Sequence, residues 1–169
     1  MTVVLRADRA ADARAVREVH IAAFPTTAEA DLVERLRKDG DDRVSLLAEV
    51  DGEIIGHIML SQMDVVVAGT RWDALGLGPV AVKPQRQREG IGQALVEKSI
   101  SAARVLGVQM LFVLGDPAYY GRFGFEARLA EPFASPYAGP YLQALMLRDG
   151  LELSATGRAD YAAAFAQLS

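Results

Sequence analysis

Residues 79–106 place an apolar strand, a glycine-containing loop and a helix in direct succession. The apolar run Pro79 to Val82 is followed by a loop that carries Gly90 and Gly92. From Gly90 to Leu106 the apolar residues recur at helical spacing: Ile91, Leu95, Ala102 and Leu106. A strand that leads through a short loop into an amphipathic helix is typical of a sheet with helices packed on its faces. This segment predicts an α/β fold.

The remaining segments add strands and helices around that unit. Upstream we expect strands at Thr2–Arg6, Val44–Val50, Glu53–Val67 and Trp72–Val82, and helices at Asp8–Phe24 and Ala28–Lys38. Asp51-Gly52 and Ala68-Gly69-Thr70 mark turns between strands. Downstream we expect strands at Met110–Leu114, Phe123–Arg128 and Tyr141–Arg148, a short helix at Pro117–Arg122, a loop at Glu131–Pro140, and a short docked helix around Tyr161 and Phe165.

Length and composition exclude several classes of protein. The chain has 169 residues, which is enough for one domain whose core needs neither a disulfide nor a metal. There are no cysteines, so a disulfide framework, a thiolate zinc site and a cysteine nucleophile are excluded. The net charge of −4 argues against broad nucleic-acid binding through a basic surface.

The N-terminus and the hydropathy pattern bear on localisation. The first residues have no long apolar stretch before their first charges, and no apolar run approaches the length of a membrane span. We therefore expect a cytoplasmic protein without membrane or nucleic-acid partners. Residues 1–169 read as a single domain, of which residues 150–169 are the least readable, and the sequence leaves open whether the chain forms a homodimer.

The loop before the predicted helix is suited to bind phosphate. Helix N-termini leave backbone N–H groups unpaired and carry partial positive charge, so they bind anions readily. Glycines at 90 and 92 would let a pyrophosphate approach the backbone without a Cβ clash. The alternative is a glycine-rich turn without a ligand. A nucleotide-binding module is disfavoured, because the loop lacks the lysine of a P-loop and the third glycine of the dinucleotide fingerprint.

The segment from Val80 to Leu95 resembles the acetyl-CoA motif of the GNAT superfamily of acyl-CoA-dependent N-acetyltransferases. In that motif a strand is followed by x-Pro, Gln/Arg-x-x-Gly-x-Gly/Ala and a helix, and the chain reads Lys83-Pro84 and then Gln87-Arg88-Glu89-Gly90-Ile91-Gly92. The resemblance extends through the order of elements to Arg148. It implies a mixed, mostly antiparallel central sheet of about six to seven strands flanked by helices.

The same resemblance implies an acetyl-CoA site and no metal. The loop amides would hold the pyrophosphate, and the backbone of the preceding strand would pair with the pantetheine arm. The cofactor-binding residues that it implies are Val80, Ala81, Val82, Gln87, Arg88, Glu89, Gly90, Ile91, Gly92 and Gln93.

Tyr120 is the candidate catalytic residue. The run Tyr119-Tyr120-Gly121-Arg122-Phe123-Gly124-Phe125 resembles the family's aromatic-Tyr-x-x-x-Gly-Phe signature, in which the tyrosine often protonates the departing CoA thiolate. The alternative is a packing role, which we expect for Tyr119. Many members carry an Asn before the tyrosine, whereas this chain has Gly115-Asp116-Pro117-Ala118, where we expect Asp116 to cap a helical turn with Pro117 at its first position.

The general base and the acceptor stay open. Some family members carry a glutamate on the strand that corresponds to Met110–Leu114, which has no acid here. Glu49, Asp73 and Asp116 are candidates, but each is also explained as a solvated or capping residue. We expect structural roles for His20 and His57. Phe24, Pro25 and Trp72 are candidates to line the acceptor site, although packing explains them equally well.

The sequence thus predicts an N-acetyltransferase. The enzyme would move an acetyl or related acyl group from acyl-CoA to an amine of a small molecule or protein by direct attack, with Tyr120 as general acid. The alternative from another class is a non-catalytic acyl-CoA-binding regulatory domain.

Overall fold

The strands of the chain form two sheets. The computed structural model describes residues 2–149 and 156–168. The larger sheet has six strands in the order β1 (Val3–Ala7), β2 (Asp42–Val50), β3 (Glu53–Gln62), β6 (Ala74–Val82), β7 (Met110–Leu114) and β9 (Leu142–Met146). The smaller sheet has the order β5 (Thr70–Trp72), β4 (Asp64–Val67), β10 (Gly157–Asp160) and β8 (Phe133–Ala134).

The larger sheet is mostly antiparallel, and helices flank it. Strand β1 pairs with β2 and strand β7 with β9 in antiparallel register, whereas β6 and β7 run parallel. The α-helices are α1 (Ala13–Ala23), α2 (Ala28–Asp39), α3 (Ile91–Val105), α4 (Pro117–Tyr120) and α5 (Ala127–Ala130). The 3₁₀ turns are η1 (Ala10–Asp12), η2 (Pro84–Arg86), η3 (Gly121–Phe123) and η4 (Ala163–Leu168). This architecture confirms the predicted mixed α/β fold.

The described residues fall into two compact units. The first takes its residues from Met1–Leu60, Gly78–Ala102 and Ala163–Ser169, and the second from Ser61–Leu77 and Ala103–Ala162. Strands β3 and β6 contribute residues to both units.

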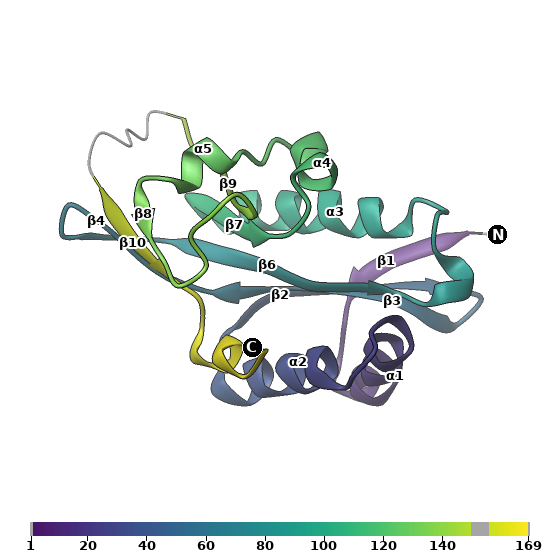
Figure 1. Cartoon of the computed structure of the whole chain (residues 1–169). Coiled ribbons are helices and arrows are strands. Elements are labelled where there is room, and N and C mark those ends of the chain that lie inside the picture. The colour runs from purple at the N-terminus through teal and green to yellow at the C-terminus, as the bar shows by residue number, and fades with distance from the viewer. Residues whose placement is uncertain (1, 150–155, 169) are drawn as a thin grey trace. The chain divides into compact units, whose positions relative to one another are not determined.

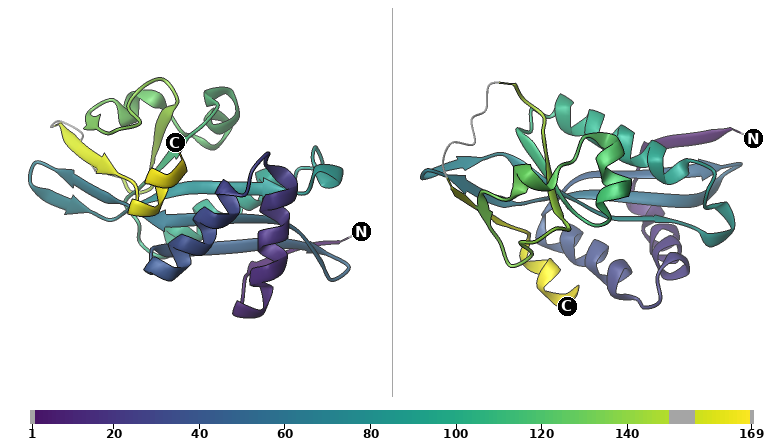
Figure 2. Two further views of the ribbon diagram at one scale, coloured as in Figure 1. Left: turned by 60° about the horizontal axis from the view of Figure 1, so that its bottom comes forward. Right: turned by 45° about the horizontal axis from the view of Figure 1, so that its top comes forward.

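In the first unit, helices cover both faces of the strands. Helices α1 and α2 lie on one face and α3 on the other (Figure 1). Turn η4 lies beside α2 (Figure 2). Helix α3 approaches β3 closely at Gly56, where a Cβ would lie 3.1 Å from Leu95 Cδ1 and 3.3 Å from the Ala81 carbonyl oxygen. Because Gly56 has no side chain, the start of α3 can pack directly on the strand backbone.

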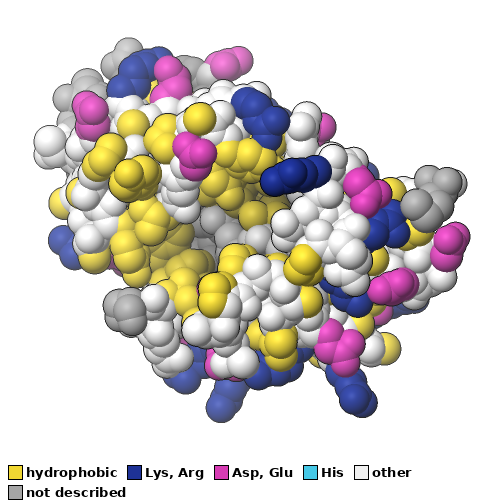
Figure 3. Space-filling view, turned by 45° about the vertical axis from the view of Figure 1, so that its right-hand side comes forward, with side chains coloured by type: hydrophobic (Ala, Val, Ile, Leu, Met, Phe, Trp, Pro, Cys, Tyr) yellow, Lys and Arg dark blue, Asp and Glu magenta, His cyan; other side chains and the backbone are white. Residues whose placement is uncertain are grey.

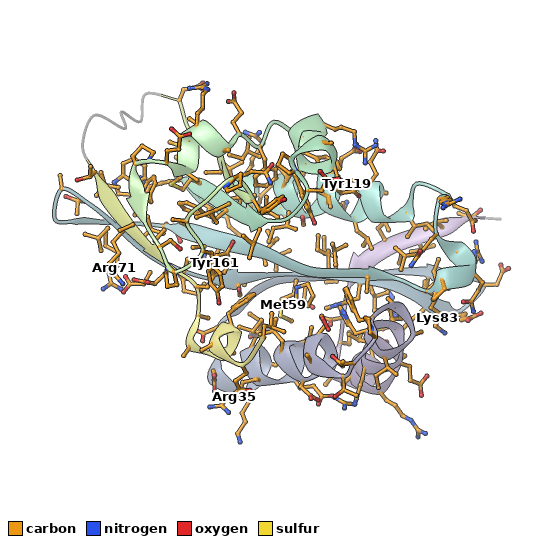
Figure 4. The ribbon with its side chains drawn as sticks, viewed as in Figure 1. Arg35, Met59, Arg71, Lys83, Tyr119 and Tyr161 are labelled. Carbon is orange, nitrogen blue, oxygen red and sulfur yellow. The ribbon has the colours of Figure 1, made fainter. Side chains whose placement is uncertain are left out.

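In the second unit, one hydrophobic core combines residues of the smaller sheet with residues of β6, β7 and β9. Phe112 and Phe133 meet edge-on with their ring centroids 5.2 Å apart. Trp72 is buried in the same core, so packing accounts for this residue. A Cβ built on Gly76 of β6 would lie 2.5 Å from Cε1 of Tyr161, a residue that is labelled in Figure 4. Because Gly76 has no side chain, the Tyr161 ring can pack directly on the strand backbone.

Two long predicted strands are interrupted. The strand predicted at Glu53–Val67 is wrong as one element, because it ends at Gln62 and β4 begins at Asp64 in the other sheet. Between them, the buried Met63 donates its N–H to the carbonyl of Ala74 at 3.1 Å. The strand predicted at Trp72–Val82 likewise breaks at Asp73, whose N–H donates to Gln109 Oε1 at 2.7 Å.

The strand predicted at Phe123–Arg128 is also wrong. Turn η3 ends at Phe123 and is capped by Gly124, which has a left-handed φ of 97°, and α5 follows from Ala127. Within the segment, Glu126 bridges Ala144 as an isolated β-bridge. The predicted docked helix appears as η4, which contains Phe165 but begins after Tyr161, and residues 150–155 of the predicted tail lie outside the described residues.

Candidate active site

The loop between β6 and α3 leads through two left-handed residues into a helix N-terminus. After η2 the chain passes through left-handed conformations at Arg88 (φ 67°) and Gly90 (φ 82°) and then enters α3 at Ile91. The first bond of the helical ladder runs from the Ala94 N–H to the Gly90 carbonyl at 3.0 Å. The amides of residues 91–93 precede that bond, so they belong to the helix end that favours anions.

Side chains of the loop hold its backbone in place. Gln87 Nε2 donates to the Val82 carbonyl at 2.9 Å, which ties the loop to the end of β6. Arg86 and Glu89 form an ion pair at 3.0 Å. Ile91, the first residue of α3, is buried. Gln93 donates to Glu97 Oε1 at 3.0 Å on the exposed helix surface.

The backbone at Gly90 is open. A Cβ built there would meet nothing within 4 Å, and Arg88 and Gly90 are both exposed. On the preceding strand, Val80 is half-buried, and Ala81 and Val82 are buried. The roles of these residues toward acetyl-CoA stay predictions.

Tyr120 lies in an aromatic cluster of the second unit. It ends α4, whose first turn is capped by Asp116 Oδ1 accepting from the Ala118 N–H at 2.9 Å, with Pro117 at the first position as predicted. Tyr119 extends from the same helix (Figure 4) and meets the Tyr120 ring edge-on, with centroids 5.0 Å apart. Burial, with a smaller contribution from Tyr119, raises the pKa of Tyr120 to about 12. The phenol is therefore protonated at neutral pH.

The two histidines lie in a buried hydrogen-bonded chain of the first unit. His20 Nε2 and His57 Nδ1 are 2.9 Å apart, and His57 Nε2 is 2.8 Å from Ser45 Oγ. Ser45 Oγ donates to Asp8 Oδ2 at 2.9 Å, and Arg37 pairs with the same carboxylate. Both imidazoles are fully buried, and neither shows on the face drawn in Figure 3.

This chain of hydrogen bonds fixes the histidine tautomers. Because Ser45 uses its hydrogen toward Asp8, it accepts from His57 Nε2–H. His57 Nδ1 then accepts from His20 Nε2–H, and His20 Nδ1 has no partner among the described residues. Burial lowers the pKa of His20 to about 3 and also lowers that of His57. Both are thus neutral, which agrees with the structural role expected for them.

The acidic candidates have local partners or local tasks. Glu49 pairs with Arg6 at 3.0 Å, and Asp116 is the helix cap. Within residues 2–149 and 156–168, no group of three or more His, Cys, Asp or Glu side chains is arranged to hold a metal ion. Across the same residues, every helix is too short or too polar to cross a membrane.

Sequence comparison identifies the family of this fold. The sequence model of the acetyltransferase (GNAT) domain matches residues 5–128. The chain is 38% identical over 134 residues to the N-acetyltransferase YjhQ of Escherichia coli (strain K12), covering 76% of this chain and 73% of that protein. It is 34% identical over 125 residues to the N-acetyltransferase YhbS of the same strain, covering 73% of this chain and 74% of that protein.

Two solved structures resemble this one over nearly the whole chain. The GNAT family N-acetyltransferase YhbS from Escherichia coli, in complex with CoA, superposes with a TM-score of 0.90 at 29% identity, covering 99% of this chain and 93% of that one. A GNAT family acetyltransferase from Brucella melitensis, in complex with acetyl-CoA, has a TM-score of 0.80 at 34% identity, covering 97% of this chain and 98% of that one.

Fold and sequence together define an acyl-CoA-dependent N-acetyltransferase. The chain belongs to the GNAT acetyltransferase family.

Proposed function

We propose that this enzyme binds acetyl-CoA at the loop around Gly90 and transfers the acetyl group to an amine of a small molecule or protein, with Tyr120 as general acid. The observation that carries the proposal is the likeness, over 97% of the chain, to the Brucella melitensis structure in complex with acetyl-CoA. The open backbone at Gly90 and the neutral phenol of Tyr120 support it.

The loop would bind the pyrophosphate of the cofactor. The amides at the start of α3 are unpaired within the helix and lie at its positive end. Each amide bonded to a charged oxygen would contribute roughly 1.5–3 kcal/mol. The left-handed turn at Gly90 leaves the space that a phosphate group would fill.

The proposed transfer is a single displacement at the thioester. The neutral amine nitrogen forms a bond to the acetyl carbon, the C–S bond breaks, and the amine proton passes to solvent. Tyr120 donates its hydroxyl proton toward the departing sulfur and is reprotonated by water. A phenol with a pKa of about 12 is a weak acid toward a thiolate, so its hydrogen bond to the developing charge supplies the main stabilisation.

Replacement of Tyr120 by Phe tests this role. An interaction made in the transition state lowers kcat and kcat/KM together when it is lost. General acid catalysis is typically worth about 10²–10⁴-fold, and water can partly replace the phenol, so we expect a loss of roughly tenfold to a few hundredfold for Tyr120→Phe. The measurement is the initial rate of thiol release from acetyl-CoA with a saturating amine acceptor.

Tyr119→Phe is the matched control, because it removes a neighbouring hydroxyl and keeps the ring that packs on Tyr120. We expect it to keep nearly full kcat. Acetyl-CoA binding should survive in both variants. Full kcat in Tyr120→Phe would show that water handles the leaving thiolate and that Tyr120 is a packing residue.

A further inference from the structure

The ring of Tyr120 occupies the space that a side chain at residue 115 would need. Gly115 follows the last residue of β7, and a Cβ built on it would lie 2.6 Å from Tyr120 Cε2 and 3.1 Å from Cδ2. Real Cβ atoms essentially never come this close to a ring carbon. The backbone of Gly115 is not left-handed, so its conformation alone does not require glycine. The close approach of the Tyr120 ring does require it.

The backbone N–H and carbonyl of Gly115 both form hydrogen bonds with residues at the start of β9 or directly before it. Its N–H donates to the Tyr141 carbonyl at 3.0 Å, and its carbonyl accepts from Gln143 Nε2 at 3.1 Å. Gln143 lies on β9 opposite Val113 of β7, and these two strands pair in antiparallel register. Two hydrogen bonds therefore hold the Gly115 backbone, against which the Tyr120 ring packs.

Gln143 has an unusual environment for an amide side chain. It is 1% exposed, and its Nε2 also donates to the Tyr141 carbonyl at 3.2 Å. Two carbonyl acceptors on one side of the amide settle which end is the nitrogen. Among the described residues Oε1 has no hydrogen-bond partner, and a buried acceptor without a partner costs stability. The Gln143 side chain contributes its hydrogen bonds to the Gly115 and Tyr141 carbonyls.

Two further aromatic rings contact Tyr120. Tyr119 meets it at 5.0 Å and 87°, and Phe125, which is buried, at 6.0 Å and 78°. The Tyr120 N–H donates to the Asp116 carbonyl at 3.0 Å, which fixes the helical turn directly after Gly115. The ring thus has neighbours on several sides, and Gly115 makes the closest approach.

We propose that Gly115 and Gln143 are positioning residues for the Tyr120 phenol. Gly115 leaves the space in which the ring lies, and Gln143 holds the Gly115 carbonyl in place. The inference rests on the proposed function of Tyr120, because positioning matters for catalysis only if the phenol acts on the leaving thiolate. Displacement of a catalytic group by about 1 Å can cost about 10²-fold in rate.

The first test compares Gly115→Ala with Gly121→Ala, each made alone and together with Tyr120→Phe. Gly121 is the matched control, since a Cβ there meets nothing within 4 Å and its backbone is not left-handed. We expect Gly115→Ala to lower kcat by about tenfold or more with KM little changed, and Gly121→Ala to have no such effect. In the Tyr120→Phe background Gly115→Ala should cause no further loss. An equal loss in both backgrounds would overturn the proposal.

The second test measures the reactivity of the Tyr120 phenol and does not depend on catalysis. Tetranitromethane reacts with phenolate, and the amounts of nitrated Tyr120 and Tyr119 are resolved by peptide mass spectrometry. If Gly115→Ala pushes the ring toward solvent, the pKa of Tyr120 falls toward its ordinary value of 10.0 and nitration rises, by about tenfold per pKa unit. Unchanged nitration would overturn the proposal. If Tyr120→Phe keeps full kcat, the proposed function fails, and nitration still decides whether Gly115 positions the ring.

Gln143→Met provides the independent variant. Methionine has a similar length and no N–H to donate, so it leaves the Gly115 and Tyr141 carbonyls without this partner. We expect increased nitration of Tyr120 and a lower kcat, both in the same direction as for Gly115→Ala. If Gly115→Ala does not fold, Gln143→Met carries the test, and wild-type nitration and kcat in that variant would overturn the proposal.

Discussion

Burial lowers the pKa of both histidines. His20 and His57 are both fully buried and neutral, and their hydrogen bonds lead through Ser45 to the Asp8 carboxylate. Burial by itself would raise the pKa of Asp8, but the nearby His57 Nε2–H, 3.6 Å from Oδ2, and the hydrogen bonds from Arg37 and Ser45 together hold it below its ordinary value. The chain of neutral rings therefore ends on an Arg37–Asp8 ion pair.

Neutral buried histidines make the fold sensitive to acid. The pKa of His20 is about 3 in the folded chain and 6.5 as its ordinary value, so below pH 6.5 the unfolded chain binds a proton that the folded chain does not. The stability that the neutral His20 contributes is fully present well above pH 6.5, and it is lost progressively as the pH falls below this value. Well below pH 6.5, His20 contributes a slope that approaches about 1.4 kcal/mol per pH unit. The free energy of unfolding, measured by urea denaturation, should therefore fall between about pH 7.5 and 5.5.

His20→Gln is the variant for this prediction. Glutamine keeps a donor toward His57 and does not titrate in this range. We expect its free energy of unfolding to depend less steeply on pH than that of the wild type. If the slope is unchanged, groups other than His20 carry the acid sensitivity.

At the scale of elements, local signals predicted several turns and the three long helices. The turn at Asp51 and Gly52 has left-handed φ values of 52° and 81°, and α2 ends at Gly40 with φ 75°. These features depend on a few neighbouring residues, so a single sequence reveals them. The glycine loop before α3 was predictable for the same reason.

Elements that depend on distant partners were not predictable. Strand β10 pairs with β4 and β8, yet its four residues include one buried side chain, Ala159, and show no clear apolar alternation. The break at Met63 depends on its bond to Ala74. In the site, Gln143 reaches Gly115 only through the pairing of β7 with β9. No local pattern carries this information.

The loop before α3 yields a prediction for cofactor binding. Gly90 has φ 82°, a conformation that Asn and Asp tolerate better than other side chains. Gly90→Asn and Gly90→Asp therefore share the backbone cost and differ in charge. If pyrophosphate lies here, we expect Gly90→Asp to bind acetyl-CoA at least about tenfold more weakly than Gly90→Asn, or about 1.4 kcal/mol.

Isothermal titration measures both variants directly. Their circular dichroism spectra should match that of the wild type, because a Cβ at residue 90 meets nothing within 4 Å. Equal affinities of the Asp and Asn variants would place the pyrophosphate away from this loop.

At the scale of the whole molecule, family membership and chemistry answer different questions. The family match over residues 5–128 and the likeness to the two cofactor-bound structures establish the kind of protein. A non-catalytic acyl-CoA-binding domain would share the fold and the loop, so the two functions differ only in whether the bound thioester is consumed.

The most direct measurement is the balance of products from acetyl-CoA. The enzyme is incubated with acetyl-CoA and a panel of small-molecule and peptide amines, and free thiol and acetylated amine are quantified together. We expect that at least one amine accelerates thiol release and that free CoA and acetylated product form in equal amounts. Tight binding of acetyl-CoA, with thiol release no faster than in the amine-free control for every amine, would contradict it and identify a binding domain.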